Sequence, residues 1–213
     1  MMQKATIGRL KPQPGGSKLG RMTRMPLNRH RGLFALLLLA FISSAAAAPS
    51  DGAVCEREMR AASLAQGVPL GVLYAVGMTE TGNRGSLHPY ALNIQGRTVF
   101  TSSASAALAE FAKARTRGIK LIDLGCMQIN HHYHGRNFAS PAAMLDPAGN
   151  VAYAARYLRE LRQQEGSWTM AVARYHAGPN NDPAQKQYIC TVIGNLAASG
   201  FGAWTPAARA FCR

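Results

Sequence analysis

The chain has 213 residues, 47% of them hydrophobic, and a formal net charge of +14 at pH 7. This length suits one domain with a sizeable core, and the charge at first indicates a protein that binds nucleic acid or an anionic surface. Residues 1–48, however, hold eight of the 24 Lys and Arg and no Asp or Glu, so the remainder carries 16 basic and 10 acidic residues, or +6. The basicity largely belongs to the start of the chain, and we do not expect nucleic acid as a partner.

Residues 1–48 have the pattern of a secretory signal peptide. A basic stretch extends to Arg31, an apolar run covers residues 33–42, and the small residues of "SSAAAAPS" supply a cleavage region between Ala45 and Ala48. The apolar run is shorter than the roughly 20 residues that span a bilayer, so we expect no stable membrane span. Met25 would give a signal of more ordinary length and is the start that we favour, while an uncleaved anchor stays an alternative. We therefore expect a mature chain in the periplasm.

Helical patterns dominate the mature chain, and prolines, glycines and capping residues mark their ends. Gly82 is the expected stop of a helix that opens at Pro69 and carries Glu80 near its end. The patterns predict helices over residues 53–66, 69–80 and 103–117, from Pro147 onward with Asp146 as N-cap, from Ser167 to Tyr175, and from Asp182 to about Ser199.

Short extended pieces lie between the predicted helices: "YALNI", "RTVF" and "LGCMQIN". Their alternation favours a small sheet. If residues 123–130 form a strand, Met127 and Ile129 face one side while Gln128 and Asn130 face the other, and amides spaced in this way suit hydrogen bonds to sugar hydroxyls. We predict one mostly helical α+β domain over residues 49–213, with the C-terminal tail docked on its body.

All four cysteines, Cys55, Cys126, Cys190 and Cys212, follow the predicted signal, as expected for a chain that meets an oxidising compartment. Four cysteines permit three full pairings, and the sequence does not choose among them. A nested pairing of Cys55 with Cys212 and Cys126 with Cys190 is our working hypothesis. The spacings lack the C-x-x-C pairs of a structural zinc site.

Glu80 is the acidic residue with the most unusual predicted surroundings. On a helix it shares a face with Leu73, Val76 and Gly77, and it lies at the helix C-terminus, where the macrodipole disfavours a negative charge. Desolvation and the dipole both favour the protonated acid, which is the form that general-acid catalysis requires. The alternative is an ordinary solvated glutamate at a frayed helix end.

Histidines gather in "INHHYHGRN", where His131, His132 and His134 lie close together in the sequence. A zinc site would need a fixed geometry and a further ligand from elsewhere, so we expect an exposed polar loop, and we expect neither a metal nor a cofactor. Several aromatic residues could stack on sugar rings or pack in the core, and the sequence leaves both readings open: Tyr133, Tyr153, Tyr157 and Trp168.

Four motifs occur in the order seen in one enzyme family. Glu80-Thr81 follows an apolar helix, and "GCMQIN" (125–130), "ARYHAGP" (173–179) and "YICTVI" (188–193) come after it. In this order the chain resembles the lytic transglycosylases with a soluble-lytic-transglycosylase (SLT) domain, over roughly residues 55–196. The resemblance implies a lysozyme-like fold, with a small sheet beside an active-site groove, that cleaves the glycan strands of peptidoglycan.

The resemblance also assigns roles to residues of the four motifs. Glu80 matches the family's single catalytic acid and base, and Thr81 lies at a position where serine is usual. Cys126 and His176 depart from the family pattern, which has leucine and asparagine there, and the second departure puts one sugar contact in doubt. The candidate substrate-binding residues, with Asn130 added from the predicted strand, are Thr81, Met127, Gln128, Asn130, Tyr175, His176 and Tyr188.

With one carboxylate, the resemblance implies that Glu80 protonates the glycosidic oxygen and then takes a proton from the muramyl C6 hydroxyl, which closes a 1,6-anhydro ring without consuming water. Asp123 is the other carboxylate that could act in a two-acid mechanism, and we expect it to serve the turn into the predicted strand instead. A hydrolysing muramidase and a catalytically silent wall-binding protein remain alternatives. Small domains of this family often serve a secretion, pilus or flagellar machine, and the sequence does not choose among these partners.

Overall fold

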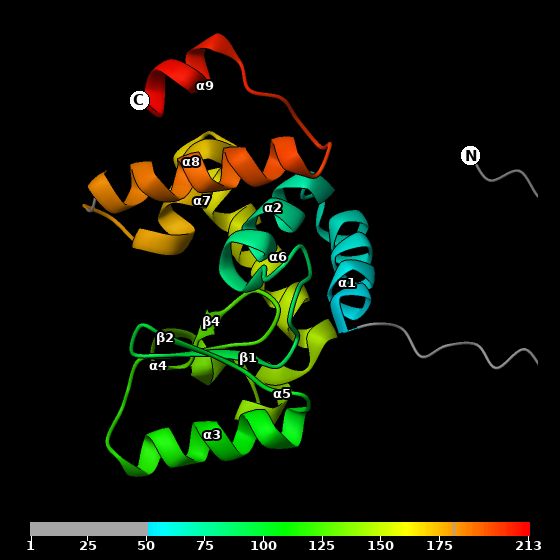
Figure 1. The fold of residues 1–213 in the computed structure, drawn as a ribbon, viewed down its shortest axis with the longest axis vertical. Helices are drawn as coiled ribbons and strands as arrows, with labels where there is room; N and C mark the ends of the chain where they lie inside the picture. The colour runs from blue at the N-terminus through cyan, green and yellow to red at the C-terminus, as the bar shows by residue number, and fades with distance from the viewer. Residues whose placement is uncertain (1–50, 181) are drawn as a thin grey trace, which may run out of the picture. The chain divides into compact units, whose positions relative to one another are not determined.

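The computed structural model describes residues 51–180 and 182–213 (Figure 1). The predicted signal peptide and its cleavage region lie outside the described residues. Within the described part, the elements in chain order are α1 (Asp51–Gln66), α2 (Leu70–Thr81), β1 (Ala91–Ile94), β2 (Arg97–Phe100), α3 (Ala104–Thr116), β3 (Ile122–Leu124), β4 (Ile129–Asn130), α4 (His131–His134), a 3₁₀ turn (Gly135–Asn137), α5 (Pro141–Leu145), α6 (Pro147–Glu165), α7 (Trp168–Ala177), α8 (Asp182–Ala198) and α9 (Pro206–Phe211). This mostly helical chain with one small sheet confirms the predicted α+β class. No helix in this part of the chain is long and apolar enough to cross a membrane.

Local capping interactions begin and end the helices where the sequence predicts them. Ser103, Asp146 and Ser167 each accept a hydrogen bond from the N–H three residues later, at the starts of α3, α6 and α7. These bonds satisfy backbone donors that a helix N-terminus leaves unpaired. At the end of α2, the N–H of Gly82 donates to the carbonyl of Met78 and the chain then leaves the helix.

The sheet is antiparallel, with the strand order β2-β1-β3-β4. β1 and β2 form a hairpin whose two turn residues, Gln95 and Gly96, both have positive φ, at 53° and 86°, as a type I′ turn requires. On the other side of β1, Asn93 lies opposite Asp123, which in turn lies opposite Asn130. Residues directly opposite one another point to the same face of a sheet, so the sheet presents a polar row.

The stretch "LGCMQIN" is not the continuous strand that we predicted. A turn over residues 125–128 separates β3 from β4, with a φ of +82° at Gly125 and +44° at Gln128. A Cβ atom on Gly125 would lie 2.6 Å from Nδ2 of Asn150, so this position requires glycine for space as well as for conformation. The predicted placement of Met127 and Gln128 on opposite faces of one strand is therefore wrong.

The helices pack so that α2 lies inside the helical part of the fold. α1 packs against α6, α2 against α8, and α7 against both α6 and α8. The side chains of Leu73, Ala75 and Val76 on α2 are fully buried. In Figure 1 the sheet lies between α3 and the larger group of helices, and the C-terminal end of α2 points toward the sheet. This arrangement holds the end of α2 at the junction between helices and sheet.

The two disulfides correct our nested pairing. Cys55 on α1 pairs with Cys126 in the 125–128 turn, and Cys190 on α8 pairs with Cys212 just after α9. The nested pairing fails because α1 packs beside the turn, whereas the C-terminal tail folds back on α8. Lys186 also lies over the ring of Phe211, at 5.5 Å from its centroid. The disulfide and this contact connect the tail to α8.

Candidate active site

A groove of about 660 Å³ lies at the junction of the sheet with α7 and the end of α2. Its walls come from the 125–128 turn and from seven helices and strands, namely α2, β1, β3, β4, α4, α6 and α7. The lining mixes carboxylates, amides, histidines and tyrosines: Glu80, Asn93, Asp123, Gln128, Asn130, Tyr133, His134, Tyr157, Arg174, Tyr175 and His176, with Ile129 and residues 177–179. This composition suits a polar, ring-shaped ligand such as a sugar.

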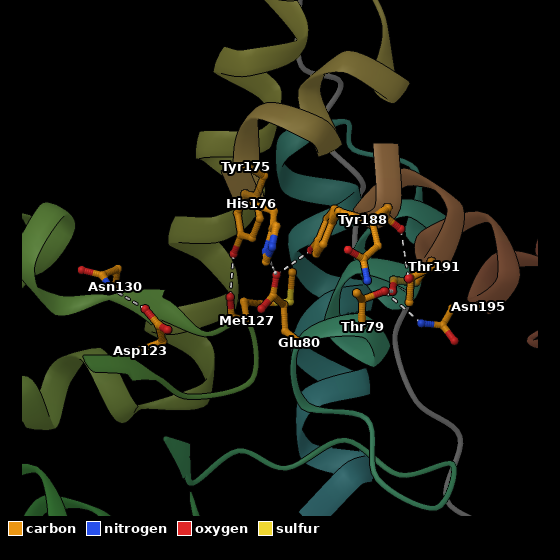
Figure 2. A network of polar contacts seen from close by, with 12 residues as sticks. Thr79, Glu80, Asp123, Met127, Asn130, Tyr175, His176, Tyr188, Thr191 and Asn195 are labelled. Atoms are coloured by element: carbon orange, nitrogen blue, oxygen red, sulfur yellow. Dashed lines mark hydrogen bonds and ion pairs between the residues drawn. The ribbon is translucent and has the colours of Figure 1, made fainter. Parts of the chain in front are cut away.

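Glu80 lies at one wall of the groove and points its carboxyl toward two aromatic side chains, His176 and Tyr188 (Figure 2). Its Oε1 accepts a hydrogen bond of 2.5 Å from the hydroxyl of Tyr188 and lies 3.8 Å from Nδ1 of His176. The rings of these two neighbours are stacked, 4.2 Å apart and within 6° of parallel. The Glu80 side chain is only 15% exposed, so the carboxyl is held in place and opens to solvent on one side only.

The 125–128 turn is held by side chains from two neighbouring helices, α6 and α7. Asn150 on α6 is fully buried; its Oδ1 accepts from the N–H of Met127 at 2.9 Å, and its Nδ2 donates to the carbonyls of Leu124 and Met144, both at 2.8 Å. The hydroxyl of Tyr175 on α7 donates to the carbonyl of Met127 at 2.7 Å. These bonds fix the turn beside the end of α2.

Burial raises the pKa of Tyr175 and of Tyr188 well above 10, and the charge of Glu80 adds to the effect in both. Both phenols therefore keep their protons and act as donors, one to the 125–128 turn and one to Glu80. The two tyrosines connect α7 and α8 to the groove.

Four of the predicted site residues line the groove together with Glu80: Gln128, Asn130, Tyr175 and His176. Thr81 and Met127 do not, because their side chains are 2% and 0% exposed. The hydroxyl of Thr81 donates to the carbonyl of Cys126 and binds the turn to α2. The expectation that Thr81 and Met127 contact substrate with their side chains does not fit this burial, and both residues support the wall from behind.

The amides of Gln128 and Asn130 also have partners within the protein. Nδ2 of Asn130 donates to Asp123 at 2.6 Å, and its Oδ1 caps α4 by accepting from two backbone N–H groups. Nε2 of Gln128 donates to the carbonyls of Ala91 and Gly125, both at 3.0 Å. These amides therefore fasten the strands and the turn, while the oxygen of Gln128 and the second N–H of Asn130 are left to meet a ligand.

Asp123 differs from our expectation in its position. It lies within β3, bonded across the strands to Asn130, and it lines the groove. Burial raises its pKa from 3.8 to about 6; the hydrogen bond from Asn130 opposes this, the charge of Glu80 adds to it, and His176 lowers it slightly. Asp123 is thus a second carboxylate of the same groove.

We expect Asp123→Asn to stabilise the protein at neutral pH. Because the folded-state pKa is raised, the folded protein binds more protons than the unfolded chain between pH 3.8 and about 6, so this residue's contribution to stability is present at low pH and is lost as pH rises through that window. The shift corresponds to at most about 3 kcal/mol, and asparagine keeps an oxygen that accepts from Asn130. Urea unfolding at about pH 4 and pH 7.5 measures the difference, and a gain of equal size at both values would contradict the explanation.

The three clustered histidines have separate neighbours. The ring of His131 packs edge-on against Phe111, and Nδ1 of His134 lies 2.8 Å from the hydroxyl of Tyr153. Burial lowers the pKa of both imidazoles. In residues 51–180 and 182–213 no group of three or more His, Cys, Asp or Glu is arranged to hold a metal ion. His134 is the member of the cluster that lines the groove.

Sequence reasoning missed Asn150, which shapes the site, and misplaced Asp123. Asn150 was hidden within an apolar helical stripe, although a buried asparagine in such a stripe is itself a sign that it has backbone partners. The sequence names Asp123 as the second carboxylate but predicts that it serves the turn into a strand, whereas it lies inside β3. The pairing of β3 with β1 is a long-range feature that directs this carboxylate into the groove.

A mostly helical α+β fold, with Glu80 held at the wall of a groove beside a small sheet, is the arrangement of a lysozyme-like domain. The family model of the transglycosylase SLT domain matches residues 58–190, and the chain belongs to this family. A search of curated proteins and a search of solved structures each found no match. The family implies peptidoglycan as the substrate.

Proposed function

We propose that the protein is a peptidoglycan lytic transglycosylase that cleaves the β-1,4 bond between N-acetylmuramic acid and N-acetylglucosamine and leaves 1,6-anhydromuramyl ends. The observation that carries the proposal is the position of Glu80, which is mostly buried at the groove wall and held by Tyr188. The order of motifs and the family match over residues 58–190 support it.

The contacts of Glu80 suit a group that gives and then takes a proton. Both Tyr188 and His176 approach Oε1, which leaves Oε2 to hold the proton that passes to the glycosidic oxygen. Once ionised, the carboxylate keeps the hydrogen bond from the tyrosine hydroxyl, and a bond of this charged kind contributes about 1.5 to 3 kcal/mol. The same Oε2 then accepts the proton of the C6 hydroxyl as that oxygen attacks C1.

Mass spectrometry of the muropeptides released from purified sacculi tests this function. A transglycosylase consumes no water, so its main products are lighter by one water than those of a muramidase and lack a reducing muramic end. Reducing muramic ends as the main product would replace the proposal with hydrolysis. Binding to sacculi without any cleavage would instead favour a silent wall-binding protein.

A hydrolysing muramidase is the second candidate, and Asp123 is the observation that favours it. This carboxylate lines the same groove as Glu80, and a second carboxylate is what a hydrolase with two catalytic acids requires. Its raised pKa, about 6, leaves it partly protonated near that pH, and its bond to Asn130 occupies Oδ1. Both features make Asp123 less suited to act as a catalytic carboxylate, and they therefore favour the mechanism in which Glu80 is the single acid.

Tyr188→Phe should slow cleavage by about tenfold or more, because it removes a hydrogen bond to a group that becomes charged during the reaction. The phenylalanine keeps the ring that stacks on His176, so the fold should survive. Tyr74→Phe is the matched control. Tyr74 lies on α2, its ring packs against that of Phe201, and it does not line the groove. Turnover on sacculi measures both variants, and wild-type turnover of Tyr188→Phe would refute the role of its hydroxyl.

Gln128→Ala should also reduce turnover roughly tenfold. It removes the amide that bonds the 125–128 turn to β1, together with the oxygen that faces the groove. A variant with wild-type turnover would show that this amide has no part in the reaction.

We further propose that the protein works outside the cytoplasm, in the periplasm. The two disulfides support this location, since such bonds persist in oxidising compartments. The predicted signal peptide points the same way and remains a prediction. A secretion, pilus or flagellar assembly as partner likewise remains a proposal that rests on the family alone.

A further inference from the structure

His176 stands where the family pattern has asparagine, and it is a titratable group beside Glu80. Its Nδ1 lies 3.8 Å from Oε1 of Glu80, and its ring is stacked on that of Tyr188 at 4.2 Å. The stack fixes the plane of the imidazole, so the nitrogen that faces the carboxylate cannot easily turn away. An asparagine at this position could contact a sugar but could not take a proton.

We propose that His176 sets the protonation state of Glu80: with its imidazole protonated, His176 holds the carboxylate ionised, and with its imidazole neutral, it lets Glu80 take a proton and act as general acid. This inference rests on the proposed function. His176 touches neither the reacting bond nor the C6 hydroxyl in this scheme. It is a positioning residue that acts through Glu80.

The exposure of the two side chains supports a role for His176 as the group that responds to the pH of the solvent. The His176 side chain is 47% exposed and Glu80 is 15% exposed, so the imidazole exchanges protons with solvent more readily than the carboxyl behind it. The contact with Glu80 raises the pKa of His176 above 6.5; burial opposes this, and the charges of Glu80 and Asp123 add to it. At 3.8 Å the protonated imidazole and the ionised carboxylate attract each other.

The other charged and titratable groups around His176 are few. Glu80 faces it from α2, Asp123 from β3 and Tyr188 from α8. Arg174 on α7 also lines the groove, but its guanidinium is paired with Glu165 at 2.9 Å. The carboxylates therefore dominate the field at the imidazole, with Glu80 as the nearer partner.

The first test measures the coupling without any reaction. In an NMR titration of the mature protein, the ring signal of His176, assigned by its loss in His176→Asn, should report a pKa above 6.5 in the wild type. That pKa should fall toward 6.5 in Glu80→Gln, because the contact with Glu80 is the first cause that raises it, and it should fall less in Asp123→Asn. An unchanged titration in Glu80→Gln would overturn the coupling.

The second test compares turnover of His176→Asn and wild type on sacculi between about pH 5 and pH 8. We expect the ratio of variant to wild-type turnover to fall as pH rises, by roughly threefold to tenfold, because only the wild type carries the inhibitory imidazolium at low pH. His132→Asn is the matched control, since His132 is exposed and does not line the groove. Its ratio should not depend on pH.

The outcomes separate the proposal from simpler roles. A ratio for His176→Asn that is constant with pH would mean that His176 only contacts sugar, and a ratio that rises with pH would also overturn the proposal. A wild-type protein that cleaves no glycan at any pH would remove both the proposed function and the role of His176 in it. In that case the NMR titration still decides whether the two side chains are coupled, so the two failures remain distinguishable.

Discussion

Glu80→Gln should lower glycan cleavage by about a thousandfold or more, while the fold stays intact. In the single-acid mechanism one side chain both donates a proton to the leaving oxygen and takes one from the C6 hydroxyl, and general acid-base steps of this kind each contribute typically 10² to 10⁴ in rate. Glutamine has the same shape, and its oxygen can still accept from Tyr188. Muropeptide release from sacculi gives the activity, and thermal unfolding gives the stability.

Two comparison variants sharpen this result. Glu56→Gln on α1 changes a carboxylate that lies outside the groove and forms a long ion pair with Arg60, at 3.9 Å, so its turnover should equal that of the wild type. Asp123→Asn should lose far less activity than Glu80→Gln. If Asp123→Asn were as inactive as Glu80→Gln, two carboxylates would be required, and hydrolysis would replace the transglycosylase mechanism.

The features of the fold that the sequence predicts are those set by local interactions. The end of α2 follows from Gly82, and the start of α6 follows from Asp146 and Pro147, because caps and prolines act within one turn of the chain. The position of Glu80 at the groove depends on these local signals together with the apolar face of α2. For this reason the sequence predicts the position of Glu80 at the end of α2.

The features that the sequence did not predict are set by partners distant in the chain. The positive φ of Gln128 belongs to a turn that Asn150 holds from 22 or more residues away, and no local pattern announces it. Thr81 points inward because Cys126 offers it a carbonyl. Asp123 reaches the groove because β3 pairs with β1. In each case a contact between residues distant in the chain places the side chain, and for Gln128 it overrides the strand periodicity on which our prediction relied.

The contacts of Tyr188 and His176 with the Glu80 carboxyl also join residues that are distant in the chain. Tyr188 and His176 come from α8 and α7, more than 90 residues after Glu80, and both approach one oxygen of that carboxyl. Motif matching names these residues but does not say that one donates a hydrogen bond while the other competes for a proton. That distinction depends on the stacked rings and on their distances from Oε1.

Removing the disulfide between Cys55 and Cys126 should lower the free energy of unfolding more than removing the disulfide between Cys190 and Cys212. The bond closes a loop with a sequence separation of 71, against 22 for Cys190 and Cys212. The loop-entropy relation gives losses of about 4 kcal/mol and about 3 kcal/mol respectively. Both sulfurs of the first pair are fully buried, so Cys55→Ala with Cys126→Ala also leaves a small cavity, and the second pair is only half-buried. A loss of about 4 kcal/mol is a large part of the stability of a typical domain.

Urea unfolding of the two double variants measures which disulfide contributes more to stability. Turnover on sacculi shows which of them also supports the active site. Cys126 belongs to the turn that Thr81 bonds to α2, so loss of its disulfide loosens the wall beside Glu80, and we expect turnover to fall even under conditions in which the variant is folded. Cys190→Ala with Cys212→Ala frees only the tail on α8, and the folded variant should keep its turnover. A larger loss of stability for the second pair than for the first would contradict the loop argument, and a peptide map linking Cys55 to Cys212 would contradict the pairing itself.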